Sequence, residues 1–173
     1  VLLLSRYALD CQPYEKIIFK KNYTWETSSL REWLNGDFIN AAFSAEEKAM
    51  IPSVTVSANR NPDCSRDPGN DTEDKVFLLG ILEAEKYFQN DEARICVPTA
   101  YAIANCDKKN RVTINYTQDG TATCRWWLRE PAGPSNNIIN SAYVSGDGDV
   151  NSYGESIMGE NCVRPALWID ISD

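Results

Sequence analysis

Two blocks near the end of the chain, Cys124-Arg-Trp-Trp-Leu-Arg-Glu-Pro131 and Val163-Arg-Pro-Ala-Leu-Trp-Ile-Asp-Ile171, decide the predicted fold. Both are rich in aromatic and apolar residues, which is typical of buried strands. The segment between them is rich in Asn, Ser, Gly, Asp and Tyr and has almost no helical or strand periodicity. Such composition indicates exposed, turn-rich surface. A rigid frame that carries a permissive surface is common in binding modules.

The remainder of the chain predicts short helices followed by strands and long loops, which is an α+β pattern. Strands are expected at residues 1–5, 54–57, 76–79 and 112–116, a short extended piece at 17–19, helices within 24–43 and at 44–50, 82–88 and 98–104, and a long loop at 59–74. Asp119-Gly120 is a good hairpin turn before the Cys124 block. We find no repeat and no second domain, so residues 1–173 are expected to form a single domain.

The first long helix is predicted from an apolar stripe. Leu30, Trp33, Leu34, Phe38 and Ile39 recur at spacings of three and four, which favours core packing of one helical face. Either Ser at 28 or 29 can cap its start, and the Asn-Gly pair at 35–36 is expected to break it into two short helices. A capping box from residue 44 to 47 starts the next helix.

The bulk composition excludes several classes of function. The net charge is −8, so an acidic surface is expected to repel nucleic acid phosphates and anionic lipids. No apolar run is long enough to span a bilayer. Histidine is absent, which removes Ser-His-Asp and Cys-His catalysis and every His-ligated zinc site. No cofactor is therefore expected, although carboxylates, Lys, Tyr and Cys leave an enzyme possible.

Cysteine and aspartate patterns give no metal signature. The six cysteines have no C-x-x-C spacing, and the sequence leaves their pairing and the cellular compartment open. Asp147, Asp149 and Asn151 alternate as in a calcium loop, but Ser152 and Met158 occupy the places that an EF-hand reserves for Gly and an acidic residue. Two tight turns explain this motif better than a looser calcium site does.

The Trp126-Trp127 pair allows two interpretations. Neighbouring strand residues point to opposite faces, so one Trp can lie in the core while the other anchors a ligand near the surface. Alternatively, both indoles are buried between layers.

An ordered series of motifs resembles a bacterial and phage domain family of unknown function. These motifs are Leu2-Leu-Leu-Ser5, Thr24-Trp-Glu-Thr27, Leu30-Arg-Glu-Trp-Leu-Asn35, Ala42-Phe43, Asp74-Lys-Val-Phe-Leu-Leu79, Pro98-Thr-Ala-Tyr-Ala102, Trp126-Trp-Leu-Arg129 and Val163-Arg-Pro-Ala-Leu-Trp-Ile169. The resemblance implies a C-type-lectin-like fold of the formylglycine-generating-enzyme type, and the chain is expected to lack some N-terminal strands of the family. Some members resemble the variable proteins of diversity-generating retroelements, in which mutagenesis rewrites surface codons while the fold stays fixed.

That resemblance implies a ligand-binding surface between residues 130 and 161. The expected contact residues are Trp126, Glu130, Ala132, Asn136, Asn137, Ile139, Asn140, Tyr143, Ser145, Ser152, Tyr153, Glu155, Ser156, Met158, Glu160 and Asn161. Their Tyr, Ser and Asn content suits adaptable polar contact with a few rigid anchors. Glu130 departs from the Ser that is common in the family, and Met158 is not a product expected from mutating an Asn codon.

The function expected from these observations is non-catalytic binding of a protein or cell-surface ligand. The alternatives are a structural or assembly module of a larger phage or cell-surface protein, and an enzyme like the formylglycine-generating type. The catalytic cysteine pair of those enzymes does not match Cys124 and Cys162, so no catalytic residue is assigned. An extracellular, cell-surface or virion-associated location would suit the binding function.

Overall fold

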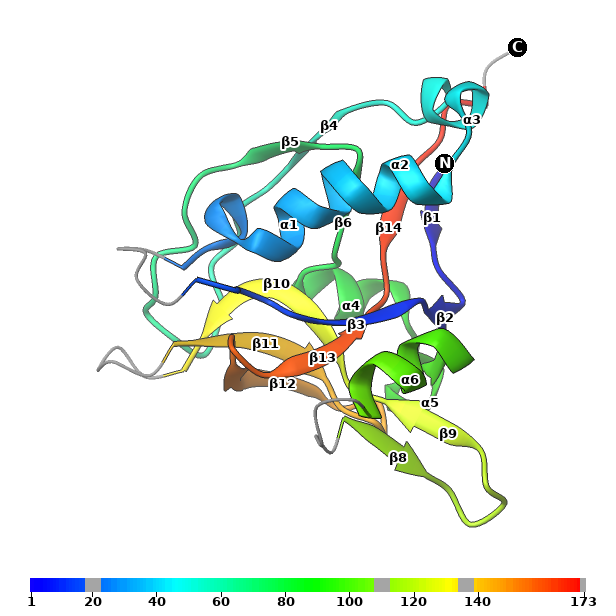
Figure 1. Ribbon diagram of the computed structural model, residues 1–173. Coiled ribbons are helices and arrows are strands. Elements are labelled where there is room, and N and C mark those ends of the chain that lie inside the picture. Colours follow the sequence, from blue (N-terminus) through cyan, green and yellow to red (C-terminus); the bar gives the residue numbers. More distant parts are fainter. Residues whose placement is uncertain (18–22, 108–112, 134–138, 172–173) are drawn as a thin grey trace.

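The computed structural model describes residues 1–17, 23–107, 113–133 and 139–171. In this part of the chain, short helices pack around several small open sheets (Figure 1). The expected α+β class is confirmed at this level. The extended piece expected at 17–19 reaches into residues that lie outside the described ranges.

The main sheet has five strands in the order β12-β11-β10-β13-β3. Their bounds are β3 Asp10–Pro13, β10 Trp126–Ala132, β11 Asn140–Val144, β12 Val150–Ser156 and β13 Glu160–Val163. Only the β10–β13 pairing is parallel in this sheet. The expectation of an irregular surface segment between the two blocks is therefore wrong. Register shifts in β10–β11 and β11–β12 interrupt the strand alternation, and so they hide it in the sequence.

The smaller sheets connect distant parts of the chain. β1 (Leu2–Leu4), β14 (Ala166–Trp168) and β6 (Val76–Phe77) form an antiparallel sheet in the order β1-β14-β6. The two-stranded sheets pair β2 (Tyr7–Ala8) with β7 (Val97–Pro98), β4 (Val54–Val56) with β5 (Thr72–Asp74), and β8 (Ile114–Tyr116) with β9 (Ala122–Cys124). The β8–β9 hairpin was expected from Asp119-Gly120, and it projects from the body of the molecule in Figure 1. The end of the expected long loop is strand β5.

The helices are short. They are η1 Trp25–Thr27, α1 Ser29–Trp33, η2 Leu34–Phe38, α2 Ile39–Ala42, α3 Ala45–Ala49, α4 Ile81–Tyr87, α5 Asp91–Arg94 and α6 Ala100–Asp107. Figure 1 shows α1 to α2 above β10 and β3, and α6 below β3. The capping box at the start of α3 is confirmed, and Ser28 caps α1 by accepting a hydrogen bond from the Arg31 amide at 3.1 Å.

The expected helix break at Asn35-Gly36 is wrong, because η2 is a π-helical turn that continues α1 into α2. The Asn35 side chain instead joins this helix to β6. Its Nδ2 donates to the Val76 carbonyl at 2.8 Å, and its Oδ1 accepts from the Lys75 amide at 2.9 Å. These bonds satisfy backbone groups that would otherwise be unpaired beside the helix. Asn therefore acts here through its side chain and not as a helix breaker.

The core is built on both faces of β10. Trp126 and Trp127 are each 0% exposed, which confirms the interpretation that both indoles are buried and overturns the surface anchor. Trp127 packs edge-on against Tyr14, with ring centroids 5.8 Å apart, and Trp126 packs against Phe88 at 6.4 Å. Each indole N–H has a backbone acceptor, at Arg94 for Trp126 (3.2 Å) and Gln12 for Trp127 (2.9 Å). The two sides of one strand thus hold the layers together.

We predict that Trp127→Ala lowers the free energy of unfolding by about 3–5 kcal/mol, because it leaves a large cavity and an unpaired carbonyl. Urea denaturation measures this loss. Tyr153→Ala is the matched control, since its ring is 69% exposed, and it should change stability by less than about 0.5 kcal/mol. Similar values for the two variants would contradict the central position of β10.

Candidate ligand-binding face

Three side chains from three segments meet on the solvent side of the main sheet. Arg125 precedes β10, Tyr143 lies in β11 and Glu155 lies in β12. The Arg125 guanidinium pairs with the Glu155 carboxylate at 3.1 Å and lies 5.5 Å from the centroid of the Tyr143 ring. Burial is the main cause that raises the pKa of Tyr143, and Arg125 opposes it. We call these three residues the Arg125 cluster.

The Arg125 cluster is not needed to hold the fold. Its ion pair is about one-third exposed on both sides, and exposed pairs contribute at most about 1 kcal/mol. The charges and the aromatic ring therefore remain available to a ligand. Arginine and tyrosine are also the residue types that most often supply binding energy in interfaces.

A polar groove of about 450 Å³ lies beside the Arg125 cluster. It is enclosed by the β8–β9 hairpin and the turn between β11 and β12, with Arg125 in its wall. Its lining residues are Ile95, Asn115, Tyr116, Thr117, Thr123, Arg125, Ser145, Gly146 and Asp147. The groove and the Arg125 cluster together form what we call the ligand-binding face. Hydroxyl, amide and carboxylate groups in this arrangement suit a polar ligand that both donates and accepts hydrogen bonds.

The β11–β12 turn on this face is pinned from below. Arg94 in α5 is buried, and its Nε donates to the Gly148 carbonyl at 2.9 Å. Gly148 has a φ of +92°, and a Cβ there would overlap the Asp91 carbonyl. Glycine is therefore required at this close approach. These contacts with α5 hold the turn, and with it Asp147, in one position.

The predicted contact residues divide by exposure. Those with exposed or partly exposed positions are Ile139, Asn140, Tyr143, Ser145, Tyr153, Glu155, Ser156 and Met158. Buried positions, for which the expected surface location is wrong, are Trp126, Glu130, Ala132, Ser152, Glu160 and Asn161. Asn136 and Asn137 lie outside the described residues. For all of the buried positions except Ser152, which lies in the edge strand β12, burial follows from place in the sheet, because β10 and β13 are inner strands.

Sequence reasoning missed the contribution of Arg125 and of the β8–β9 hairpin. Arg125 lies in the Cys124–Pro131 block, which is expected to be a buried strand, although it precedes the buried Trp pair and its side chain is partly exposed. Asn115 and Tyr116 were expected in a strand but received no binding role. Their alternation next to a hairpin turn was the available signal.

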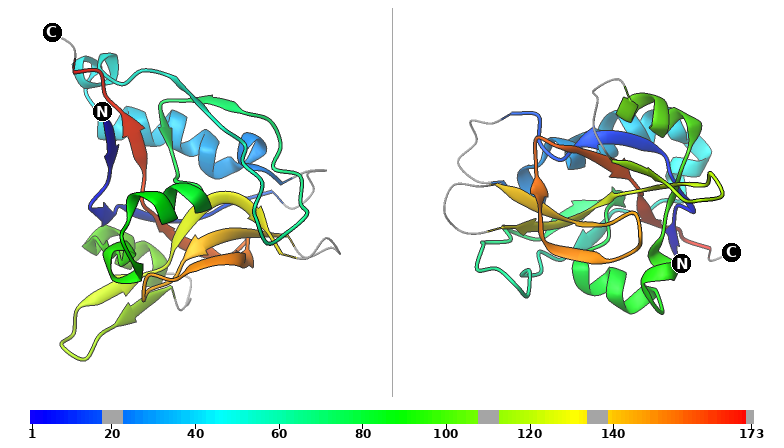
Figure 2. Two further views of the ribbon diagram at one scale, coloured as in Figure 1. Left: turned by 180° about the vertical axis from the view of Figure 1, so that it is seen from behind. Right: turned by 90° about the horizontal axis from the view of Figure 1, so that it is seen from below.

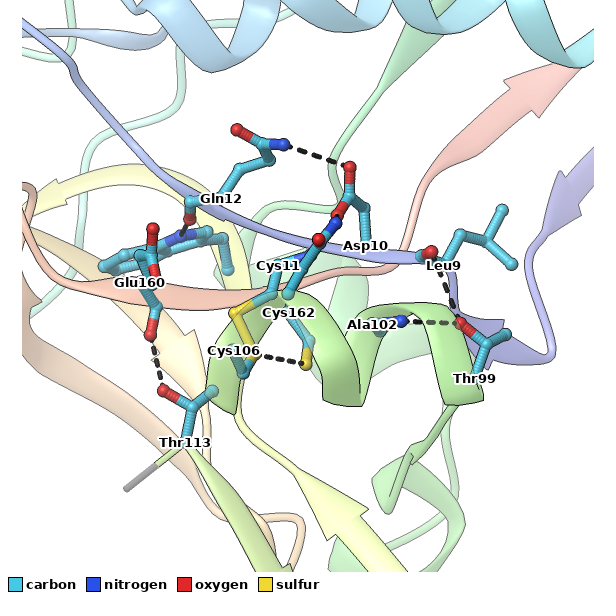
Figure 3. The surroundings of a disulfide bond; sticks show 12 residues. Leu9, Asp10, Cys11, Gln12, Thr99, Ala102, Cys106, Thr113, Glu160 and Cys162 are labelled. Atoms are coloured by element: carbon cyan, nitrogen blue, oxygen red, sulfur yellow. Dashed lines mark hydrogen bonds between the residues drawn. A yellow bond between two sulfur atoms is a disulfide. The ribbon is translucent and has the colours of Figure 1, made fainter. Parts of the chain in front are cut away.

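The Asp147 motif forms one of the two expected tight turns, between Ser145 and Asp149, and Asn151 lies in strand β12. Asp147 accepts a hydrogen bond from the Ser145 hydroxyl, and Asn151 Oδ1 accepts from the Gly154 amide at 2.8 Å. Among the described cysteine and acidic side chains, the group close enough to hold one ion is Cys11, Cys106 and Cys162. Two of these sulfurs are joined in the Cys11–Cys106 disulfide, so a metal there would first require reduction (Figure 3).

Cys64 is partly exposed, whereas the free thiols of Cys96, Cys124 and Cys162 are buried beside that disulfide. Cys162 Sγ lies 3.9 Å from Cys106 Sγ. A hydrogen bond with Cys162 and burial raise the pKa of Cys124, and a hydrogen bond with Cys124 and burial raise that of Cys96. Reactive cysteines are exposed and have low pKa values. These thiols are therefore structural in character.

Glu130 is the carboxyl group whose environment is most unusual. It is 3% exposed, and burial raises its pKa to about 7 against the opposing effect of Arg129. Its Oε2 accepts from the Ile81 amide at 2.9 Å, whereas Oε1 has no hydrogen-bond partner in the described chain. A cavity of about 10 Å³ adjoins it, which is room for about one water molecule. Glu130 does not line the polar groove.

We predict that this carboxyl group makes stability depend on pH. The folded pKa is about 7 and the ordinary value is 4.5, so the folded state binds the proton more tightly than the unfolded state does. The stabilisation is complete below about pH 4.5 and is lost by about pH 7, by roughly 3 kcal/mol at most. Glu130→Gln should remove this slope in urea titrations, and Glu155→Gln should retain it. An unchanged slope in Glu130→Gln would contradict the assignment.

The chain was compared with known families, proteins and structures, and its helices were compared with the length that a membrane span requires. The model of a family described as "Domain of unknown function (DUF6273)" matches residues 1–171. No curated protein and no solved structure matches the chain. In the described ranges, no helix has the length and apolar character to cross a membrane.

Proposed function

We propose that this chain, which belongs to the DUF6273 family, is a ligand-binding domain without catalytic activity. The observation that carries the proposal is the ligand-binding face, where the Arg125 cluster adjoins a polar groove. Its side chains project from a sheet whose strand β10 is held in the core by the buried Trp126 and Trp127. The side chains of such a face can be replaced while the fold that carries them stays the same.

A protein or cell-surface ligand is the partner that this face suits best. The groove lies between the β8–β9 hairpin and the turn that joins β11 to β12, and most of its lining residues are polar. Figure 2 shows this hairpin and the two strands from two further sides. Tyr116, Tyr143 and Tyr153 provide rigid amphipathic rings, and Ser and Asn residues provide adaptable hydrogen bonds between them. This mixture resembles antibody paratopes.

We further propose a C-type-lectin-like fold and diversification of the exposed positions, as in the variable proteins of retroelements. Support comes from the motif resemblance and from the division of residues 139–158 into buried and exposed positions. The exposed side chains Tyr153, Ser156 and Met158 contribute little to the core. Their replacement would therefore cost little stability.

Catalysis is disfavoured by the position of the perturbed carboxyl group. Glu130 has the raised pKa that an acid catalyst needs, yet its side chain is buried and borders a cavity for one water molecule. A catalytic acid must reach the proton that it transfers. Among the described residues, the carboxyl group with the raised pKa is therefore one that a substrate in the groove does not reach.

We predict that sequencing the 3′ end of the gene across its source population finds substitutions clustered at exposed codons. These are Tyr143, Ser145, Tyr153, Glu155, Ser156 and Met158. The buried codons Trp126, Ala132 and Asn161 should stay constant, because their replacement disturbs the frame. Variation spread evenly, or concentrated in buried codons, would contradict a diversified face.

Binding itself is measured by capture from a surface-protein extract of the source community. A genuine ligand is retained by the wild-type chain and by Tyr101→Ala, but is lost with Arg125→Ala and with Tyr143→Ala. Tyr101 is a suitable control because its exposed ring lies in α6, outside the ligand-binding face. A captured protein that all four baits retain would count against this face.

A second candidate function is assembly through strand β1. β1 is at the edge of its sheet, and Leu3 is 44% exposed there. An edge strand with an apolar side chain can pair with a neighbouring chain. If assembly is the function, sedimentation velocity should show an oligomer in the wild type that Leu3→Lys converts to a monomer. A monomeric wild type across the accessible concentrations would remove this candidate.

A further inference from the structure

A second groove, of about 390 Å³, lies between the helical layer and strand β3. Its walls include Trp33 from α1, Phe38 from η2 and Tyr101 from α6, and its polar residues include Asp10, Gln12 and Asp37. Figure 3 shows Asp10 and Gln12 pointing from β3 toward the helices, while Cys11 between them points to α6. This is the alternation of a strand, and it places the disulfide behind the groove.

The walls of this second groove are aromatic. The Trp33 and Phe38 rings lie 5.2 Å apart at 45°, and both are only partly buried. The Tyr101 ring, 65% exposed, lines the same groove from another helix. Aromatic rings attract cations through their quadrupole, and three aromatic side chains line this one groove.

Asp10 adds a buried carboxylate to this cavity. Its side chain accepts hydrogen bonds from the Cys11 amide (2.7 Å), the Asn105 amide group (2.6 Å) and the Gln12 amide group (3.0 Å), and the residue is 5% exposed. All three donors are neutral. Within the described ranges no ion pair involves Asp10, and neither Lys nor Arg lines the groove. Because no cationic side chain neutralises this buried carboxylate, a cation from solution would bind to it favourably.

Asp37 carries a second carboxylate at the exposed part of the groove. Two acidic groups and three rings in one cavity define the chemistry of its ligand. An anion would be repelled by the carboxylates. A bare metal ion would gain nothing from the aromatic walls, and it prefers several oxygen ligands. A cation with an apolar surface satisfies both the rings and the carboxylates.

We propose that this second groove binds a small organic cation of the alkylammonium class, with its methylated nitrogen against the aromatic walls and its charge facing Asp10. The volume of the groove is in the range of small-molecule sites. This binding does not rest on the proposed function, because the second groove and the ligand-binding face share no residue. The domain would thus have two separate sites.

The test is isothermal titration calorimetry of the whole chain with choline and with 3,3-dimethylbutan-1-ol. The alcohol has the shape of choline without its charge. Choline should bind saturably at millimolar concentration or below, and the alcohol should bind at least about tenfold more weakly, because only the cation gains the ring and carboxylate attraction. Equal affinity for the two compounds, or no saturable binding of choline, would overturn the proposal.

Variants locate the binding. Tyr101→Ala and Asp37→Asn change exposed side chains, so both variants should remain folded. Each should lower the affinity for choline by up to about tenfold. Asp10→Asn should weaken it further, with thermal unfolding used to verify its fold. Tyr153→Ala, an equally exposed tyrosine outside the groove, should leave choline affinity unchanged. Loss of affinity in Tyr153→Ala, or unchanged affinity in both Tyr101→Ala and Asp37→Asn, would place the cation elsewhere and overturn the assignment.

Discussion

The burial of two adjacent indoles on opposite faces of β10 is the constraint on which the rest of the structure depends. Trp126 and Trp127 can both be buried only if covering layers exist on both sides of that strand. Their N–H groups donate to the Arg94 and Gln12 carbonyls, which fixes α5 on one side and β3 on the other. Each covering element then brings its own chemistry: α5 supports the turn of the ligand-binding face, and β3 supplies Asp10 to the second groove.

Two buried arginines also connect separate segments at the edge of the core. Arg129 donates to the Leu78 carbonyl and pairs with Glu83, and Arg164 donates to the Ser5 and Arg94 carbonyls while lying 5.1 Å from the Trp126 ring centroid. A planar guanidinium can bond several carbonyl groups at once and stack on an aromatic ring. These residues therefore close strand ends that regular pairing leaves open. Arg125, in contrast to these two, is partly exposed and is available for recognition.

Much of the fold could be predicted from local pattern, and much of the site could not. The stripe from Leu30 to Ile39, the Ser44 capping box and the Asp119-Gly120 hairpin are local signals, and each produced the expected element. The segment after Pro131 was misjudged because bulges disrupt its alternation and because Asn and Ser fit buried strand positions when neighbours supply hydrogen bonds. Ser141 illustrates this, since its hydroxyl donates to β10 carbonyls inside the sheet. Exposure of single residues depends on which strands become inner strands, and composition does not carry that information.

The pairing of β1 with β14 has a consequence for biosynthesis. Leu2 lies opposite Trp168, and the Val1 amino group donates to the Ile169 carbonyl at 2.8 Å. Strand β3 likewise pairs with β13, which lies far later in the sequence, in the main sheet. Strands β1 and β3 are therefore synthesised long before β14 and β13, so these two pairings have a large sequence separation and are expected to form late in folding.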